Sequence, residues 1–153
     1  MGYDAIFQRV AAEFDLNWYL LMEQAYSESR LDAYAVGPND ELGLMQITRA
    51  VWGEWAPRVG ATEPHDPESN VRVAGAYLDW IRTRLARVGR PESYWTMAAY
   101  NWGIWDLLWL VEAGGLWRHV PAEHQDYATV IVVAAEADAL AAQIQAPPAS
   151  LYG

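Results

Sequence analysis

Cysteine is absent from the 153-residue chain, so disulfide bridges and thiolate chemistry are excluded. Lysine is absent as well, and the ten basic residues are all arginines. Twenty acidic residues outweigh them and give a formal net charge of −10. A nucleic-acid partner is not expected, because a phosphate backbone requires a basic surface.

Long hydrophobic runs are also missing. The longest, residues 130–135, is far shorter than the ~18 apolar residues of a membrane-spanning helix, so no transmembrane segment is expected. Residues 1–4 contain no basic region followed by an apolar one, which predicts no signal peptide in this chain. Phenylalanine occurs only twice, against nine tryptophans and nine tyrosines. Aromatic rings with a polar atom suit a partly wet groove, but they fill a small helical core equally well.

The pattern of apolar residues predicts helices throughout. A 3.6-residue period runs through 3–14, 18–29 and 67–88, and helical patterns cover most of 43–55, 92–99, 104–113 and 121–145. Asp66 is the expected N-cap of the helix that Pro67 opens. Trp105, Leu108 and Trp109 are expected to pack in the core; the alternative is that one of them stacks on a sugar. Because no segment alternates with period two, we expect an all-α single domain over 1–146, followed by a loose tail at 147–153.

Glu28 is the principal candidate for chemistry. It lies on the same helical ridge as Leu21 and Ala25, where burial would raise the pKa of its carboxyl group. A glutamic acid that keeps its proton near neutral pH can donate it to a leaving oxygen. Alternatively, Glu28 is a solvated residue of the last helical turn, or a partner of Arg9 or Arg30.

Other polar residues are candidates for a second carboxylate or for metal ligands. Most glycosidases use two carboxylates, for which the available residues are Asp32, Asp40 and Glu41; each could equally be a solvated turn residue. The three histidines, His65, His119 and His124, do not have metal-ligand spacing. We therefore expect no metal and no cofactor.

Four motifs occur in an order that resembles the soluble lytic transglycosylase (SLT) family. They are Glu28-Ser29-Arg30 followed by Gly43-Leu44-Met45-Gln46-Ile47; Asp66 to Val71 leading into Ala74 to Leu78; Ala99 to Gly103; and Glu123 with Tyr127. The resemblance extends over roughly residues 18–135. It implies a lysozyme-like α-helical fold with a groove for peptidoglycan glycan strands.

The resemblance also implies a reaction. Members of that family cleave the MurNAc-β-1,4-GlcNAc bond without water. Carried over, Glu28 would protonate the glycosidic oxygen while the acetamido group of the substrate stabilises the sugar cation. The resulting carboxylate would then accept the proton of the C6 hydroxyl as a 1,6-anhydro ring closes.

Five further residues would contact or shape the substrate site by the same matching. Gln46 would hydrogen-bond the substrate, Tyr100 would contact the sugar, and Asn101 would form that wall or hold its own loop. Tyr127 would orient Glu28 or the acetamido group, unless it is a packed core tyrosine. Ser29 would orient a neighbouring group or cap its helix.

The chain departs from the family pattern at two places near the site. Gly37 follows Ala35-Val36 where the family usually has a serine that meets the acetamido group, and Asp40-Glu41 replace the usual Gly-Ala. These departures leave two alternatives open: a hydrolytic muramidase like goose-type lysozyme, and a weakly active peptidoglycan-binding module. In each case we expect a monomer acting on the cell wall, whether periplasmic, extracellular or delivered by a phage.

Overall fold

The computed structural model describes residues 2–145, so the loose tail predicted at 147–153 lies outside the described residues. The elements are α1 (Asp4–Phe14), α2 (Trp18–Ser29), α3 (Arg49–Trp55), η1 (Ala56–Val59), α4 (Pro67–Arg87), α5 (Ser93–Trp102), α6 (Ile104–Glu112), η2 (Trp117–His119) and α7 (Ala122–Gln145). Over this part of the chain the only β-type pairing is two isolated bridges. The all-α prediction is confirmed.

Several helices begin where the sequence places a capping side chain. Asp66 accepts a hydrogen bond from the Ser69 amide at 2.9 Å, with Pro67 in the first turn of α4. Asn17 accepts from the Tyr19 amide at 3.0 Å at the start of α2. Each cap satisfies a backbone N–H that has no partner within the helix, which fixes where the helix starts.

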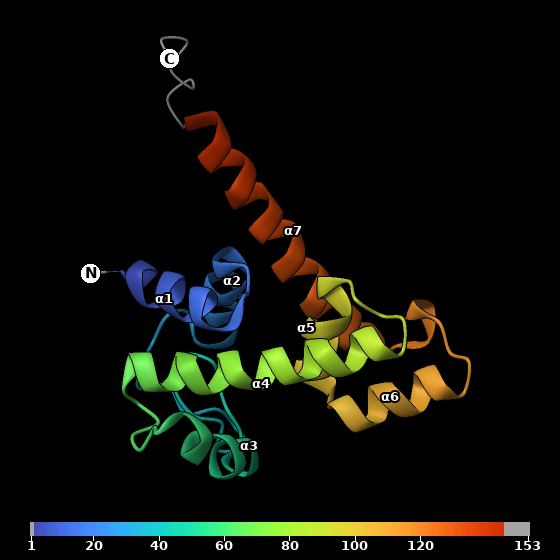
Figure 1. The fold of residues 1–153 in the computed structure, drawn as a ribbon, viewed down its shortest axis with the longest axis horizontal. Helices are drawn as coiled ribbons and strands as arrows, with labels where there is room; N and C mark the ends of the chain where they lie inside the picture. Colours follow the sequence, from blue (N-terminus) through green and yellow to red (C-terminus); the bar gives the residue numbers. More distant parts are fainter. Residues whose placement is uncertain (1, 146–153) are drawn as a thin grey trace.

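The long helix α4 runs through the middle of the molecule, with α1 and α5 packed against it (Figure 1). α7 packs against α2 and α5 and then extends beyond the other helices. The core between them includes Phe7, Leu21, Leu78, Leu107 and Ile131, all almost completely buried. This arrangement brings the end of α2, one face of α5 and residues 38–51 around one pocket, with Tyr127 of α7 packed against Gln24 of α2.

The segment before α3 is less helical than predicted. The helix begins only at Arg49, because residues 43–47 form turns in which Leu42 and Ile47 pair through two backbone hydrogen bonds of 2.9 and 3.0 Å. Gly43 has a φ of +75°, a left-handed conformation that glycine adopts without strain. The apolar spacing here reflects burial of residues in a folded loop, not one face of a helix.

Asn70 of α4 holds this loop in place. Its side chain accepts from the Met45 amide at 2.8 Å and donates to the carbonyls of Leu42 and Pro64 at 3.0 and 2.8 Å. A Cβ atom on Gly43 would lie 2.3 Å from the Asn70 amide nitrogen, so only glycine fits there. The buried Asn70 side chain of α4 therefore fixes the position of residues 42–47, which are called the site loop below.

The prediction that Trp105 and Trp109 of α6 pack in the core is wrong. Trp105 and Trp109 are 64% and 78% exposed, whereas Leu108 and its neighbour Leu107 are buried. α6 lies at the edge of the bundle, so only one face of the helix can reach the core (Figure 1).

By length and composition alone, α7 would pass as a membrane-spanning helix, although no such segment is expected from the sequence. This is a weak indication, because core helices of soluble proteins meet the same criterion. The helix carries Glu136 and Asp138, and it buries Ala128, Ile131 and Ala135. These residues give α7 a packed face within the domain.

Candidate active site

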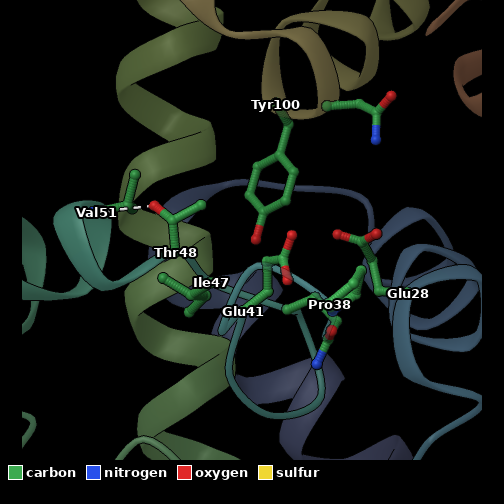
Figure 2. A pocket seen from close by; sticks show the side chains of 9 residues that line it. Glu28, Pro38, Glu41, Ile47, Thr48, Val51 and Tyr100 are labelled. Carbon is green, nitrogen blue, oxygen red and sulfur yellow. Dashed lines mark hydrogen bonds between the residues drawn. The ribbon is translucent and has the colours of Figure 1, made fainter. Parts of the chain in front are cut away.

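Glu28 lies in the last turn of α2, and its mostly buried carboxyl group reaches a pocket of about 270 Å³. Figure 2 shows the carboxyl groups of Glu28 and Glu41 facing this space, with the Tyr100 ring entering from the opposite side. The polar residues that line the pocket are Glu28, Glu41, Gln46, Thr48, Tyr100 and Asn101. Segments far apart in the sequence thus meet at one acid.

Its surroundings raise the pKa of Glu28 from 4.5 to about 8. Burial is the largest cause, because removing the carboxylate from water disfavours its charge. The negative charge of Glu41 raises the pKa further, and a hydrogen bond from Tyr127 lowers it. At neutral pH Glu28 therefore holds its proton while standing next to a cavity.

The Tyr127 hydroxyl from α7 connects Glu28 to Gln24, a residue that belongs to none of the four motifs. Gln24 lies one helical turn before Glu28 and is completely buried. Its Nε2 donates to the Tyr127 hydroxyl oxygen at 3.1 Å, which leaves the tyrosine proton for Glu28. A glutamine within the apolar stripe of α2 is the sequence signal that could have identified it.

Tyr100 of α5 forms part of the pocket wall. Its hydroxyl donates to the Met45 carbonyl at 2.8 Å, which joins α5 to the site loop. Burial raises the pKa of Tyr100 well above its ordinary value, with a smaller contribution from Glu28. The phenol remains neutral and anchors the wall of the pocket.

Gln46 also lines the pocket, but its amide protons are already bound. Nε2 donates to the carbonyls of Gly43 and Ala35 at 2.9 and 3.3 Å. The residue has a φ of +48°, an uncommon conformation for a non-glycine residue and one found at functional sites. Its Oε1 is the atom left to meet a ligand.

Asn101 and Ser29 differ in their placement. Asn101 lines the pocket, and its Oδ1 accepts a hydrogen bond from His124 Nδ1 at 2.6 Å. Ser29 does not line the pocket; its hydroxyl donates back to the Ala25 carbonyl at 3.0 Å. Two of the predicted site residues, Ser29 and Tyr127, are not among the residues that line the pocket: Ser29 bonds within α2, and Tyr127 contacts Gln24 and Glu28.

This arrangement suits proton transfer by a single carboxyl group. Glu28 holds its proton at neutral pH and faces a polar cavity, and the Tyr127 hydroxyl is close enough to lower its pKa. Within residues 2–145, no group of three or more His, Asp or Glu side chains is placed to hold a metal ion. The chemistry that these residues can perform is general acid catalysis followed by general base catalysis.

Comparison with known proteins gives a family for this site. The family model described as "Transglycosylase SLT domain" matches residues 5–108. The chain is 38% identical over 104 residues to the membrane-bound lytic murein transglycosylase F of Maricaulis maris, and 33% identical over 104 residues to that of Alteromonas mediterranea. These alignments cover 67% of this chain but only 22% and 21% of those proteins, so the chain spans about a fifth of their length.

Solved structures show the same fold. The lytic transglycosylase Slt of Pseudomonas aeruginosa, solved as an inactive mutant, superposes with a TM-score of 0.77 at 19% identity, over 99% of this chain and 26% of that one. The 70-kDa soluble lytic transglycosylase of Escherichia coli gives 0.75 at 21% identity, over 88% of this chain and 23% of that one. The predicted lysozyme-like α-helical fold is confirmed.

Proposed function

The chain belongs to the transglycosylase SLT domain family, and from this we propose that it is a peptidoglycan lytic transglycosylase with Glu28 as its acid and base. The bond cleaved would be MurNAc-β-1,4-GlcNAc, and the product would carry a 1,6-anhydro ring. The observation that carries the proposal is the state of Glu28: a protonated carboxyl group, mostly buried, at the edge of a polar cavity.

In the first step Glu28 donates its proton to the glycosidic oxygen as the bond from C1 to that oxygen breaks. The carbonyl oxygen of the substrate's own acetamido group bonds to C1 and gives a cyclic oxazolinium ion. A pKa of about 8 suits this step, because the acid is in its protonated form at the pH of the reaction.

In the second step the C6 hydroxyl attacks C1, and Glu28, now a carboxylate, accepts the hydroxyl proton. The bond between C1 and the acetamido oxygen breaks, which restores the acetamido group and the protonated Glu28. No water is consumed. A single carboxyl group performs both transfers, and Tyr127 keeps it oriented by donating a hydrogen bond.

The remaining residues would bind the glycan. Tyr100, Asn101 and the Oε1 atom of Gln46 line the same pocket and present polar atoms or ring edges to a sugar. The named relatives are lytic murein transglycosylases, and those of Maricaulis maris and Alteromonas mediterranea are membrane-bound, which supports action on the wall in the periplasm. These names lend no support to the hydrolytic and binding-module alternatives.

Release of soluble fragments from purified peptidoglycan sacculi tests the proposal. Glu28→Gln removes the transferable proton with little change of shape, and the rate should fall ~10³-fold. Glu23→Gln is the matched control, because Glu23 is also on α2 but does not line the pocket. Binding of bulgecin A, with which a 70-kDa soluble lytic transglycosylase was solved, checks that the Glu28→Gln pocket is intact. Full activity in Glu28→Gln would refute the assignment.

A further inference from the structure

Gly37 and Glu41 fit together at the edge of the pocket. A Cβ atom built on Gly37 would lie 2.3 Å from Oε2 of Glu41 and 2.5 Å from Oε1 of Gln46, closer than real Cβ atoms approach. The two residues are also paired through the backbone, where the Gly37 amide donates to the Glu41 carbonyl at 2.8 Å. The missing side chain at position 37 is therefore what admits the Glu41 carboxylate.

This carboxylate is held in place, and within residues 2–145 no salt bridge neutralises it. Oε2 accepts a hydrogen bond from the Asn39 amide at 2.9 Å, which fixes the direction of the side chain. The nearby arginine, Arg49, pairs with Asp40 and not with Glu41, at 3.8 Å. Among the described residues, no basic side chain forms a salt bridge with Glu41, so its negative charge remains available to a ligand in the pocket.

The acetamido group of an N-acetylated sugar is a suitable partner for this anion. Its N–H is a hydrogen-bond donor, and the donor becomes more acidic as the acetamido carbonyl oxygen bonds to C1 and positive charge spreads onto nitrogen. A hydrogen bond from this N–H to a carboxylate is therefore stronger in the transition state than in the bound substrate. Such an interaction raises the rate of the chemical step.

We propose that Glu41 accepts a hydrogen bond from the acetamido N–H of the sugar being cleaved and stabilises the oxazolinium ion by its charge. This inference rests on the proposed function. It names the protein group that assists the attack of the substrate's acetamido oxygen on C1. The N–H proton stays on nitrogen throughout. Glu28 alone gains and loses a proton, and Glu41 remains a carboxylate in both steps.

Steady-state rates with a soluble glycan strand test the assignment. Glu41→Ala should lower kcat ~100-fold with a much smaller change in KM, because the interaction is strongest in the transition state. Glu41→Gln keeps an acceptor oxygen but loses the charge, so its kcat should lie between that of Glu41→Ala and that of the wild-type chain. Asp40→Ala removes the same charge from the neighbouring exposed residue and should change kcat less than 2-fold. A kcat for Glu41→Ala equal to that of Asp40→Ala would overturn the proposal.

A second test moves the acceptor group from position 41 to position 37. Gly37→Ser alone should lower kcat, because the new side chain overlaps Oε2 of Glu41 and would displace that flexible side chain from the edge of the pocket. The double variant G37S/E41A removes the overlap with Glu41, leaves only the flexible end of the Gln46 side chain to shift, and places a hydroxyl acceptor near the same position, so kcat should recover at least 5-fold over Glu41→Ala. A double variant no faster than Glu41→Ala would contradict a role for an acceptor at this place.

Binding of a stable mimic separates this inference from the proposed function. The protonated form of MurNAc-thiazoline carries the ring N–H and resembles the oxazolinium ion, and calorimetry at a pH where this form is present should show at least 10-fold weaker binding to Glu41→Ala than to the wild-type chain or Asp40→Ala. Equal binding by all three proteins would refute the role of Glu41, and it would leave the proposed acid and base role of Glu28 unaffected. If Glu28→Gln were fully active, the proposed function itself would fail.

Discussion

Gln24 Nε2 donates a hydrogen bond of 3.1 Å to the hydroxyl of Tyr127, which links α2 to α7 directly behind the acid. Because this hydrogen bond occupies an acceptor position of the hydroxyl oxygen, the tyrosine proton is directed to Glu28. Within residues 2–145 the other amide atom, Gln24 Oε1, is buried and has no hydrogen-bond partner. An unsatisfied buried oxygen costs about 1–3 kcal/mol, so this side chain is retained against a penalty to stability.

Gln24→Leu should separate activity from stability. The variant removes the unpaired oxygen and the hydrogen bond to Tyr127 together, so the free energy of unfolding in urea should be unchanged or about 1 kcal/mol higher. Fragment release should fall ~10-fold, because Tyr127 is no longer held toward Glu28. Gln8→Leu, at an exposed position of α1, is the control for both measurements. An unaltered rate for Gln24→Leu would remove Gln24 from the account.

Tyr127→Phe should shift the pH dependence of kcat/KM. The tyrosine hydrogen bond lowers the pKa of Glu28, whereas burial and Glu41 raise it to about 8. Without the hydroxyl that pKa rises, so Glu28 keeps its proton to higher pH and the alkaline limb moves upward. A limb that moves to lower pH, or does not move, would show that Tyr127 does not donate to Glu28.

Tyr100→Phe should destabilise the domain and loosen the site loop. The Met45 carbonyl loses the hydrogen bond of 2.8 Å from the tyrosine hydroxyl, and the free energy of unfolding should fall by about 1–2 kcal/mol. KM should rise, since Met45 belongs to the loop that forms the pocket. Tyr94→Phe is a suitable control, because no hydrogen bond of the Tyr94 hydroxyl is found within the described residues. Equal stability of the two variants would contradict the anchoring role.

Glu23 should make stability depend on pH. Burial, together with a hydrogen bond to Asp138 of α7 and the charge of that residue, raises the pKa of Glu23 from 4.5 to about 7. A raised pKa in the folded state means that its contribution to stability is complete below pH 4.5 and is lost as the pH rises through about 7.

Thermal unfolding at pH 5 and pH 8 checks this expectation. Glu23→Gln cannot ionise, so its Tm should exceed that of the wild-type chain at pH 8 by a few degrees and differ little at pH 5. Glu136→Gln, an exposed substitution on α7, should follow the wild-type chain at both values. A constant difference between Glu23→Gln and the wild-type chain at the two pH values would disprove the titration.

The helices and the burial of Glu28 were predictable from the sequence, because both depend on local patterns. Asp66 with Pro67 marks the start of α4, and the apolar ridge before Glu28 indicates burial. The turns at 43–47 were not predictable from periodicity, since they depend on Asn70, 25 residues beyond Met45. A helical period cannot distinguish a buried loop from a buried helix face.

The partners of the acid required tertiary structure. Gln24 acquires its meaning only when α7 brings Tyr127 against α2, 103 residues later in the chain. Glu41 is a turn residue by sequence, and its access to the pocket depends on the absence of a side chain at Gly37. The exposure of Trp109 likewise follows from the edge position of α6 and not from its composition.

Mass spectrometry of the fragments released from purified peptidoglycan tests the central claim most directly. The account predicts that the wild-type chain releases 1,6-anhydroMurNAc products, one water lighter than hydrolysed products, and that Glu28→Gln releases neither. Fragments that carry a reducing MurNAc end, or anhydro products formed at the wild-type rate by Glu28→Gln, would contradict it.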